Sequence, residues 1–154
     1  MLGVIDVGGG LRGIYGAGVL DYCLEQGIKF DYCIGVSAGS ANLLSYLSGQ
    51  REYNYRYFFE YSFRKEYMSV KNFWLKGSYL DMDYIFSTLC NSDGESPLNY
   101  PAFVKSGTPL RIVATSAKTG KTVYFTEKDL HQDCYDVIKA SCSFPVINLP
   151  YIII

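Results

Sequence analysis

Several absences in this sequence of 154 residues each exclude a class of protein. The chain has one histidine, His131, and no His, Cys and acidic residues at metal-ligand spacing, so neither a metal site nor a cofactor is predicted. Its five cysteines include no Cys-x-x-Cys pair, which favours free buried thiols in a reducing compartment. A formal net charge of −1 gives no reason to expect nucleic acid as a partner.

Long apolar segments are missing as well. No run approaches the roughly 20 residues that span a bilayer. The N-terminal residues 1–6 lack the basic residues and the apolar core of a signal peptide. With 49% hydrophobic and 19% charged residues, and no repeat or clear linker, the chain is typical of one globular domain. We therefore expect a single domain over residues 1–154 and a cytoplasmic location.

The N-terminal third alternates strand and helix patterns. Residues 2–7 are a short apolar run, and residues 14–26 repeat apolar side chains at helical spacing before Gly27. A second strand is predicted over 30–36 and a second helix over 38–48, with one apolar face. This βαβα order is typical of a parallel sheet covered by helices, so the sequence predicts an α/β fold.

The remaining two thirds are less regular. Residues 51–86 are rich in aromatic side chains with interleaved charges, and we expect helices and loops packed over one edge of the sheet. Residues 91–101 have the composition of a polar loop. A hairpin is predicted from strands over 110–116 and 122–126, followed by a helix over 133–142.

The most informative segment places Ser37 between the second predicted strand and the second predicted helix. Its pattern, G-x-S-x-G, is typical of a serine on a sharp strand-to-helix turn. Such a turn needs small residues two positions before and after the serine, and it presents the hydroxyl at a helix N-terminus. The predicted residues of this turn around Ser37 are Gly35, Val36, Ala38 and Gly39.

A serine hydroxyl is a weak nucleophile and needs a base. His131 is surrounded by polar, loop-like residues, and we expect it to be an exposed loop histidine rather than part of a triad. A carboxylate acting directly on Ser37 is the other option. Asp93–Gly94 lies in a polar loop, and an ordinary turn is the expected role.

A glycine-rich segment after the first strand also matches G-x-G-x-x-G and has two interpretations. A dinucleotide-binding loop would require an acid at the end of the second strand, whereas Asp31 lies near the start of that strand. Alternatively, consecutive glycines point backbone N–H groups at one site and form an oxyanion hole, which we expect to face Ser37. The predicted oxyanion-hole residues are Gly8, Gly9, Gly10, Leu11, Arg12 and Gly13.

The two motifs together resemble the patatin-like phospholipase family, and are closest to its bacterial members. Ser48–Arg51 and Ala140–Pro145 match as well, so the resemblance covers essentially the whole chain. It implies a three-layer α/β/α fold with a mainly parallel central sheet. It also implies a Ser–Asp dyad without histidine, in which Ser37 is the nucleophile. Gly8, Gly9 and Gly10 would supply backbone donors and Arg12 would stabilise the loop, with a phospholipid or carboxylic ester as substrate.

The aspartate of that family lies in an Asp-Gly-Gly or Asp-Gly-Ala motif, and no such motif occurs before Ile154. We therefore expect the N-terminal portion of a longer patatin-like protein, cut inside or just before a buried strand, because the sequence stops on the β-branched run Ile152–Ile154. The base would lie beyond residue 154, and this chain alone would hydrolyse esters poorly. A nucleotide-binding module and a non-catalytic lipid-binding remnant are the alternatives.

The aromatic stretch at residues 51–76 has two interpretations. Aromatic side chains flanked by Lys71 and Lys76 are compatible with peripheral membrane contact or an acyl-chain site. Rings that simply cover the sheet are the simpler expectation, because aromatic residues are ordinary core material.

Overall fold

The computed structural model describes residues 1–144 and 147. Strands and helices alternate over the first third of the chain, and their bounds agree with the predicted ones to within a residue or two. The elements of this βαβα unit (residues 3–47) are β1 (Gly3–Asp6), the 3-10 helix η1 (Gly10–Gly13), α1 (Ile14–Glu25), β2 (Tyr32–Val36) and α2 (Ala38–Leu47).

The four strands form one sheet in the order β1-β2-β3-β4. β1 pairs with β2, and β2 pairs with β3 (Leu110–Thr115), in parallel. β4 (Thr122–Thr126) closes the predicted hairpin antiparallel to β3. The α/β class and the mainly parallel sheet are therefore confirmed. The register places Asp6 opposite Gly35 and Val36 opposite Val113, so the carboxyl ends of the three parallel strands meet at one edge.

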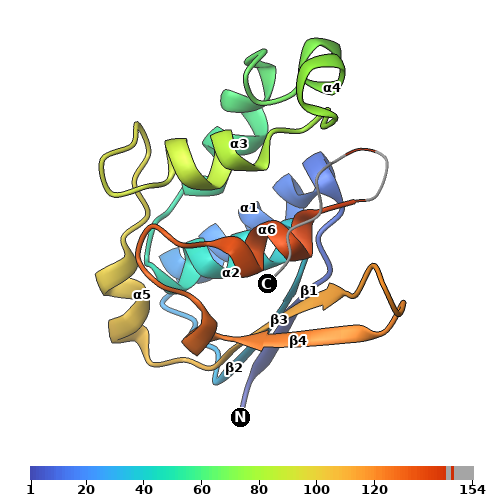
Figure 1. Cartoon of the computed structure of the whole chain (residues 1–154). Helices are drawn as coiled ribbons and strands as arrows, with labels where there is room; N and C mark the ends of the chain where they lie inside the picture. Colours follow the sequence, from blue (N-terminus) through green and yellow to red (C-terminus); the bar gives the residue numbers. More distant parts are fainter. Residues whose placement is uncertain (145–146, 148–154) are drawn as a thin grey trace.

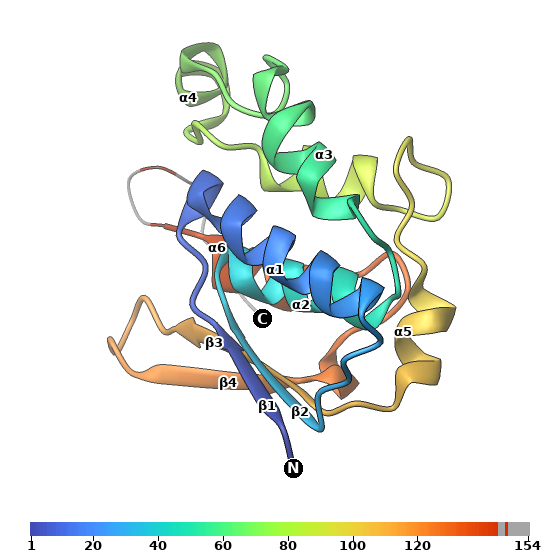
Figure 2. The ribbon, with the colours of Figure 1, turned by 180° about the vertical axis from the view of Figure 1, so that it is seen from behind.

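Helices α1, α2 and α6 (Asp136–Cys142) lie over one face of the sheet (Figures 1 and 2). The strand residues on this face are buried, as Cys33 and Ile112 show. On the other face the Ile5 side chain is 65% exposed and the Tyr124 side chain is 62% exposed. The alternation follows the two-residue period of a strand.

Helix α2 differs from its prediction of a single apolar face. Nine of its residues, all except Ala41, are buried. The reason is its central position, because α2 contacts β2 below it, α1 beside it, and α5 (Tyr100–Ser106) and α6 at its other sides. A helix surrounded in this way has no solvent face, so small and polar residues such as Ser40, Asn42 and Ser45 are buried with the leucines.

Residues 53–98 form a further layer, called here the aromatic cap. It lies above α1 and α2 on the side away from the sheet, and α3 packs on both helices (Figures 1 and 2). The expected packing over a sheet edge was therefore wrong. The elements of the cap are α3 (Tyr53–Phe59), η2 (Tyr61–Phe63), α4 (Val70–Lys76) and the π-helix η3 (Tyr84–Leu89).

Helix α5 was not predicted, since residues 91–101 were interpreted as a loop. Its boundary signals are nevertheless present. The Asn99 side chain caps the helix by accepting a hydrogen bond from the Ala102 N–H at 3.2 Å, and Pro101 lies in the first turn. Gly107 ends the helix at a φ of 62°. The predicted helix over 133–142 begins later, at Asp136. The final apolar run lies, except for Ile147, outside the described residues.

Candidate active site

Ser37 joins β2 to α2 in a conformation that L-residues rarely adopt. Its φ is 55° and its ψ is −134°, a region that favours glycine and costs a serine of the order of 1–3 kcal/mol. The neighbouring glycines permit the turn. A side chain at Gly35 would overlap the backbone of Ser40, and one at Gly39 would overlap the backbone of Asp6. Ser37 therefore lies in a strained strand-to-helix turn flanked by glycines.

Hydrogen bonds on both sides hold the Ser37 backbone. Its N–H donates to the Ser141 hydroxyl at 2.7 Å, and that hydroxyl donates to the Val113 carbonyl on β3 at 2.6 Å. The Ser37 carbonyl accepts from the Ser40 N–H at 2.9 Å and from the Ser40 hydroxyl at 2.6 Å. Ser141 was part of a motif noted in the sequence, but no role had been predicted for it.

The glycine-rich loop packs directly against this turn. A side chain at Gly8 would overlap the Val36 carbonyl, so the two motifs are in contact. The Asp6 carboxylate accepts from the Gly8 N–H at 2.9 Å and from the Asn42 side chain at 2.9 Å. The same Asn42 amide donates to the Gly13 carbonyl at 2.9 Å. Asp6 and Asn42, which sequence reasoning missed, thus fix both ends of the loop.

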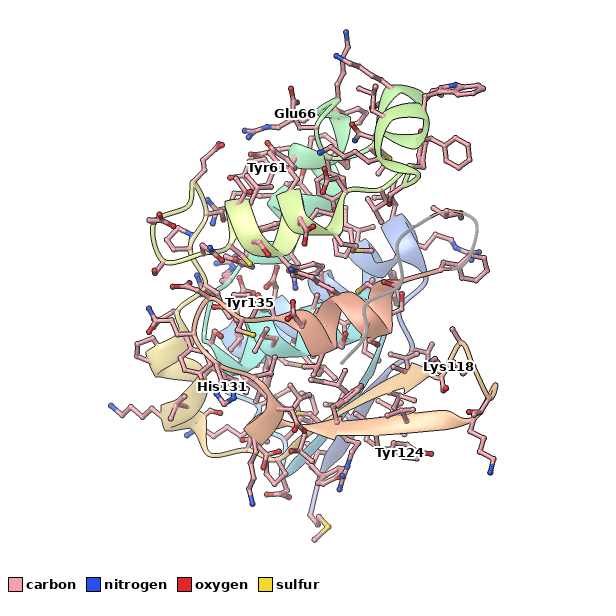
Figure 3. All side chains as sticks on the ribbon, viewed as in Figure 1. Tyr61, Glu66, Lys118, Tyr124, His131 and Tyr135 are labelled. Carbon is pink, nitrogen blue, oxygen red and sulfur yellow. The ribbon has the colours of Figure 1, made fainter. Side chains whose placement is uncertain are left out.

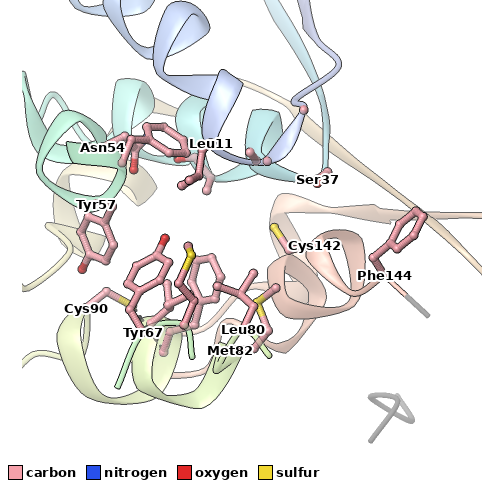
Figure 4. A pocket seen from close by; sticks show the side chains of 18 of the residues that line it. Leu11, Ser37, Asn54, Tyr57, Tyr67, Leu80, Met82, Cys90, Cys142 and Phe144 are labelled. Carbon is pink, nitrogen blue, oxygen red and sulfur yellow. Dashed lines mark hydrogen bonds between the residues drawn. The ribbon is translucent and has the colours of Figure 1, made fainter. Parts of the chain in front are cut away.

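The remaining loop residues border a cavity. Gly9, Gly10 and Ser37 line it together, and the Leu11 side chain points into it (Figure 4). The N–H groups of Gly9 and Gly10 donate no hydrogen bond within the described part of the chain, whereas that of Gly8 is paired with Asp6. Arg12 is exposed at the cavity, and its N–H donates to the Gly9 carbonyl at 3.3 Å.

The cavity has a volume of about 670 Å³ and extends from Ser37 into the aromatic cap (Figure 4). Most of the residues that line it are apolar or aromatic, and many of them come from α2, α3, η3 and the segment between α4 and η3. Among the described residues that line it, Arg12 is the only charged one, and none is Asp, Glu or His. Its size and lining are those of a site for a mainly apolar small molecule.

The Cys142 thiol is the side-chain neighbour of the Ser37 hydroxyl. Burial raises the pKa of Cys142 to about 12, although hydrogen bonds with the Ser40 and Ser37 hydroxyls act in the opposite direction. The thiol is therefore neutral at physiological pH, and it is not a base for Ser37.

The other predicted acids and bases lie elsewhere. His131 is exposed near α5, where its backbone pairs with Cys134, and it does not line the cavity (Figure 3). Gly94 donates its N–H to the Asn91 carbonyl at 2.9 Å, so Asp93–Gly94 belongs to a turn. Asp31 accepts from the Leu2 N–H at 2.6 Å at the opposite end of the sheet from Ser37, where it is out of reach of a nucleotide at the glycine loop.

Within residues 1–144 and 147, no group of three His, Cys, Asp or Glu side chains is placed to hold a metal ion. The same residues include no helix that is both long and apolar enough to cross a membrane.

A parallel strand that delivers a serine at positive φ to the start of a helix is typical of the α/β class of serine hydrolases. Comparison with known families identifies one family within this class. The sequence model of the patatin-like phospholipase family matches residues 7–153, and the chain belongs to this family. The uncharacterized protein YjjU of Escherichia coli (strain K12) is 28% identical over 148 residues. The match covers 94% of this chain, which spans about 40% of the length of that relative.

Proposed function

We propose that the chain carries the nucleophile and the oxyanion hole of a serine lipid acyl hydrolase. The observation that carries this proposal is the position of Ser37, a strained serine that opens onto an apolar cavity of about 670 Å³ beside a glycine-rich loop. Membership of the patatin-like phospholipase family supports lipid acyl hydrolysis in general.

In the proposed reaction, the Ser37 oxygen attacks the carbonyl carbon of a lipid or carboxylic ester. The Ser37 proton passes to a base and then to the leaving alcohol as the ester C–O bond breaks. Water attacks the resulting acyl-enzyme, releases the fatty acid and returns a proton to Ser37. The oxyanion would be stabilised by the N–H groups of Gly9 and Gly10, which donate no hydrogen bond to any described residue, whereas the Gly8 N–H is occupied by Asp6.

We further propose that the base is an aspartate supplied by chain that follows residue 154, which would complete a Ser–Asp dyad. Two observations support this: no carboxylate or imidazole lines the described part of the cavity, and the family resemblance implies such an aspartate. Removal of one member of a catalytic unit costs most of its rate enhancement. The chain of 154 residues is therefore expected to turn over esters weakly or not at all.

The test is covalent labelling with a fluorophosphonate, read by mass spectrometry. The wild type should acquire the label on Ser37, and Ser37→Ala should not. Ser116→Ala, in the turn between β3 and β4 and outside the cavity lining, should label normally. Turnover of a p-nitrophenyl ester should rise strongly in a chain extended past Ile154. Labelling that persists in Ser37→Ala, or full turnover by the shorter chain, would contradict the nucleophile or the dyad respectively.

The two alternatives make different predictions for the same protein. A nucleotide-binding module would show a thermal shift with NAD or ATP and no Ser37 labelling. A non-catalytic lipid-binding remnant would bind a fatty acid without being labelled and without turnover in the extended chain.

We also propose that residues 51–76 contact a membrane surface. The support is the exposure of large apolar side chains on this segment of the cap, where Phe63 and Trp74 are each 80% exposed and Leu75 is 71% exposed. Lys71, which lies on α4 with Trp74 and Leu75, is exposed and would contact anionic headgroups.

Flotation with phosphatidylglycerol-containing vesicles tests this surface. Trp74→Ala should reduce the bound fraction, whereas Tyr124→Ala, which removes an exposed ring from the sheet, should leave it unchanged. Equal flotation of wild type and Trp74→Ala would overturn the membrane contact and leave the hydrolase proposal untouched.

A further inference from the structure

In the described part of the chain, the cavity is open at one end and closed at the other. Ser37 lies at the open end, where the lining residues Leu11 and Phe144 are 46% and 65% exposed. Tyr57 and Cys90 lie across the cavity from Ser37 (Figure 4). The lining residues called here the closed end are each at most 9% exposed; they are Tyr53, Tyr57, Cys90, Leu98 and Tyr135.

Cys90 lies among the other residues of the closed end. The Leu98 N–H donates to the Cys90 carbonyl at 3.0 Å. Burial is the main cause of the raised pKa values of Tyr53, Tyr57 and Tyr135, and the nearby Cys90 thiol contributes to all three. Cys90 has the smallest side chain of this group, so the size of the residue at this position determines how deep the cavity is.

The polar atoms of the closed end are bound by the protein itself. The Tyr53 hydroxyl donates to the Ser96 carbonyl at 2.8 Å, and the Tyr57 hydroxyl lies 3.2 Å from the same carbonyl. The Cys90 thiol donates to the Phe86 carbonyl at 3.2 Å, and burial raises its pKa to about 12, so it is neutral. Rings, hydrocarbon and a neutral thiol suit the methyl end of an acyl chain and exclude a charged group.

Helix α2 runs along the cavity and indicates its length. The residues of this helix and its N-cap that line the cavity are Ser37, Ala38, Ala41 and Leu44. Ser37 and Leu44 are two helical turns apart, a rise of about 10 Å. The Asn54 side chain donates to the Ala41 carbonyl at 3.1 Å, so α3 and its tyrosines begin beside the half of α2 that is remote from Ser37.

This length corresponds to a medium acyl chain. An extended chain advances about 1.2 Å per bond, so about ten carbons connect Ser37 to the closed end. At about 30 Å³ per methylene, close to the volume of a water molecule, such a chain fills roughly 300 Å³. The cavity of about 670 Å³ therefore has room for this chain and for the alcohol part of the ester.

We propose that Cys90 sets a chain-length limit: the cavity takes an acyl chain of about ten carbons, whose methyl end contacts Cys90, and longer chains gain no further contact. Cys90 is then a specificity-determining residue, remote from the reacting atoms. The proposal rests on the proposed function, because it takes the cavity as the acyl-chain site.

Calorimetric binding of free fatty acids tests the limit without any turnover. Saturated acids from hexanoate to palmitate are titrated into the complete chain, each below its aggregation concentration. Affinity should rise about fourfold with each added methylene, because each one buries apolar surface, and should stop rising at about ten carbons. Ser37→Ala should stop at the same length, so the result is independent of catalysis.

Two substitutions at the closed end should move this length in opposite directions. Cys90→Leu extends a side chain into the cavity and should shorten the limit by about two carbons, whereas Leu98→Ala removes one and should lengthen it by about two. A general loss of stability cannot shift the limit both ways. Cys134→Leu makes the same substitution at an exposed cysteine that does not line the cavity, and it should behave as wild type.

Affinity that keeps rising up to palmitate would overturn the limit, as would a limit that stays the same in both Cys90→Leu and Leu98→Ala. If no fatty acid bound while Ser37 was still labelled, the acyl-site assignment would fail and the proposed reaction would stand. A limit that moves as expected, but without labelling of Ser37, would retain the role of Cys90 and contradict the nucleophile.

Discussion

The βαβα unit and the aromatic cap are held together by different means. In the unit, glycines let backbone meet backbone, with Gly8 against Val36 and Gly39 against Asp6. In the cap, side chains make the contacts, through tilted and edge-to-face tyrosine pairs and ion pairs such as Arg64 with Glu95 at 2.6 Å. The comparison teaches that the geometry around Ser37 tolerates almost no added atom, whereas the cap depends on how its side chains pack.

The largest expected effect is on stability, and it is tested by alanine substitution at two glycines of the βαβα unit. Gly39→Ala should lower the free energy of unfolding by about 3 kcal/mol or abolish folding, because the new methyl group would overlap the Asp6 backbone. Gly18→Ala is the control, since nothing lies within 4 Å of a side chain at this position of α1. It should stabilise the chain by about 0.5–1 kcal/mol. Urea unfolding monitored by circular dichroism measures both, and similar values for the two variants would break the comparison.

A second pair of variants compares the inner and outer rings of the cap. Tyr57 is 6% exposed and packs between Tyr53 and Tyr61, so Tyr57→Ala should cost about 3 kcal/mol of unfolding free energy. Trp74→Ala removes a ring that is 80% exposed and should change stability by less than about 0.5 kcal/mol. A cost at Trp74 equal to that at Tyr57 in chemical denaturation would show that the outer face of the cap is also packed.

Ser141 links the Ser37 turn to β3, so removal of its hydroxyl should lower the reactivity of Ser37. Ser141→Ala leaves the Ser37 N–H unpaired, which should lower stability by about 1–2 kcal/mol and slow fluorophosphonate labelling about tenfold. Ser141→Thr keeps the hydroxyl and should restore the labelling rate. Ser143→Ala, two positions along, removes a hydroxyl that donates to the Lys139 carbonyl and serves as the control. An unchanged labelling rate in Ser141→Ala would show that Ser141 does not help to position Ser37.

The smallest expected effect is a difference in pH dependence: the stability of the cap should fall at acidic pH before that of the βαβα unit. Burial raises the pKa of Asp81, but hydrogen bonds from the Lys76 ammonium and the Tyr84 N–H outweigh it and lower the pKa overall. A hydrogen bond from Arg64 lowers the pKa of Glu95. These carboxylates therefore stabilise the cap above their unfolded pKa values of about 4, and this stabilisation is lost as the pH falls through the lower folded values.

The measurement is amide hydrogen exchange, corrected for the intrinsic pH dependence. Protection in α4 and η3 should fall below about pH 4 while protection in β2 and α2 is retained. Asp81→Asn should have weaker cap protection at neutral pH and a smaller loss on acidification. Parallel loss in the cap and in β2 would show that the two regions unfold as one.

The contrast between the βαβα unit and the cap also determines which features could be predicted from the sequence. β1, α1, β2 and α2 follow from apolar spacing and from glycine stops, because their signals are local. The contact of Gly8 with the serine turn followed from the shared edge of parallel strands. The bond from Ser37 to Ser141 joins residues 104 positions apart, and no local pattern encodes it. Asn42 offered a weak signal, as an amide within an apolar helix.

The cap was misplaced for a related reason. Tyr53, Tyr57 and Tyr61 recur at helical spacing, which predicts a buried face but does not specify what covers it. Their partners are α1 and α2 rather than the sheet. Helix α5 was missed although Asn99, Pro101 and Gly107 mark both of its ends, because the helix is only seven residues long and shows no extended apolar periodicity.

The backbone angles of Ser37 bear on how this protein would evolve. At a φ of 55° and a ψ of −134°, glycine is the residue of lowest energy, and Ser37→Gly should make the chain more stable by about 1 kcal/mol or more. Selection for stability alone would therefore favour loss of the hydroxyl. Any descendant that keeps serine at this position is less stable than its glycine variant. A library of variants at position 37, sorted first for heat resistance and then for fluorophosphonate labelling, would show this conflict between stability and reactivity.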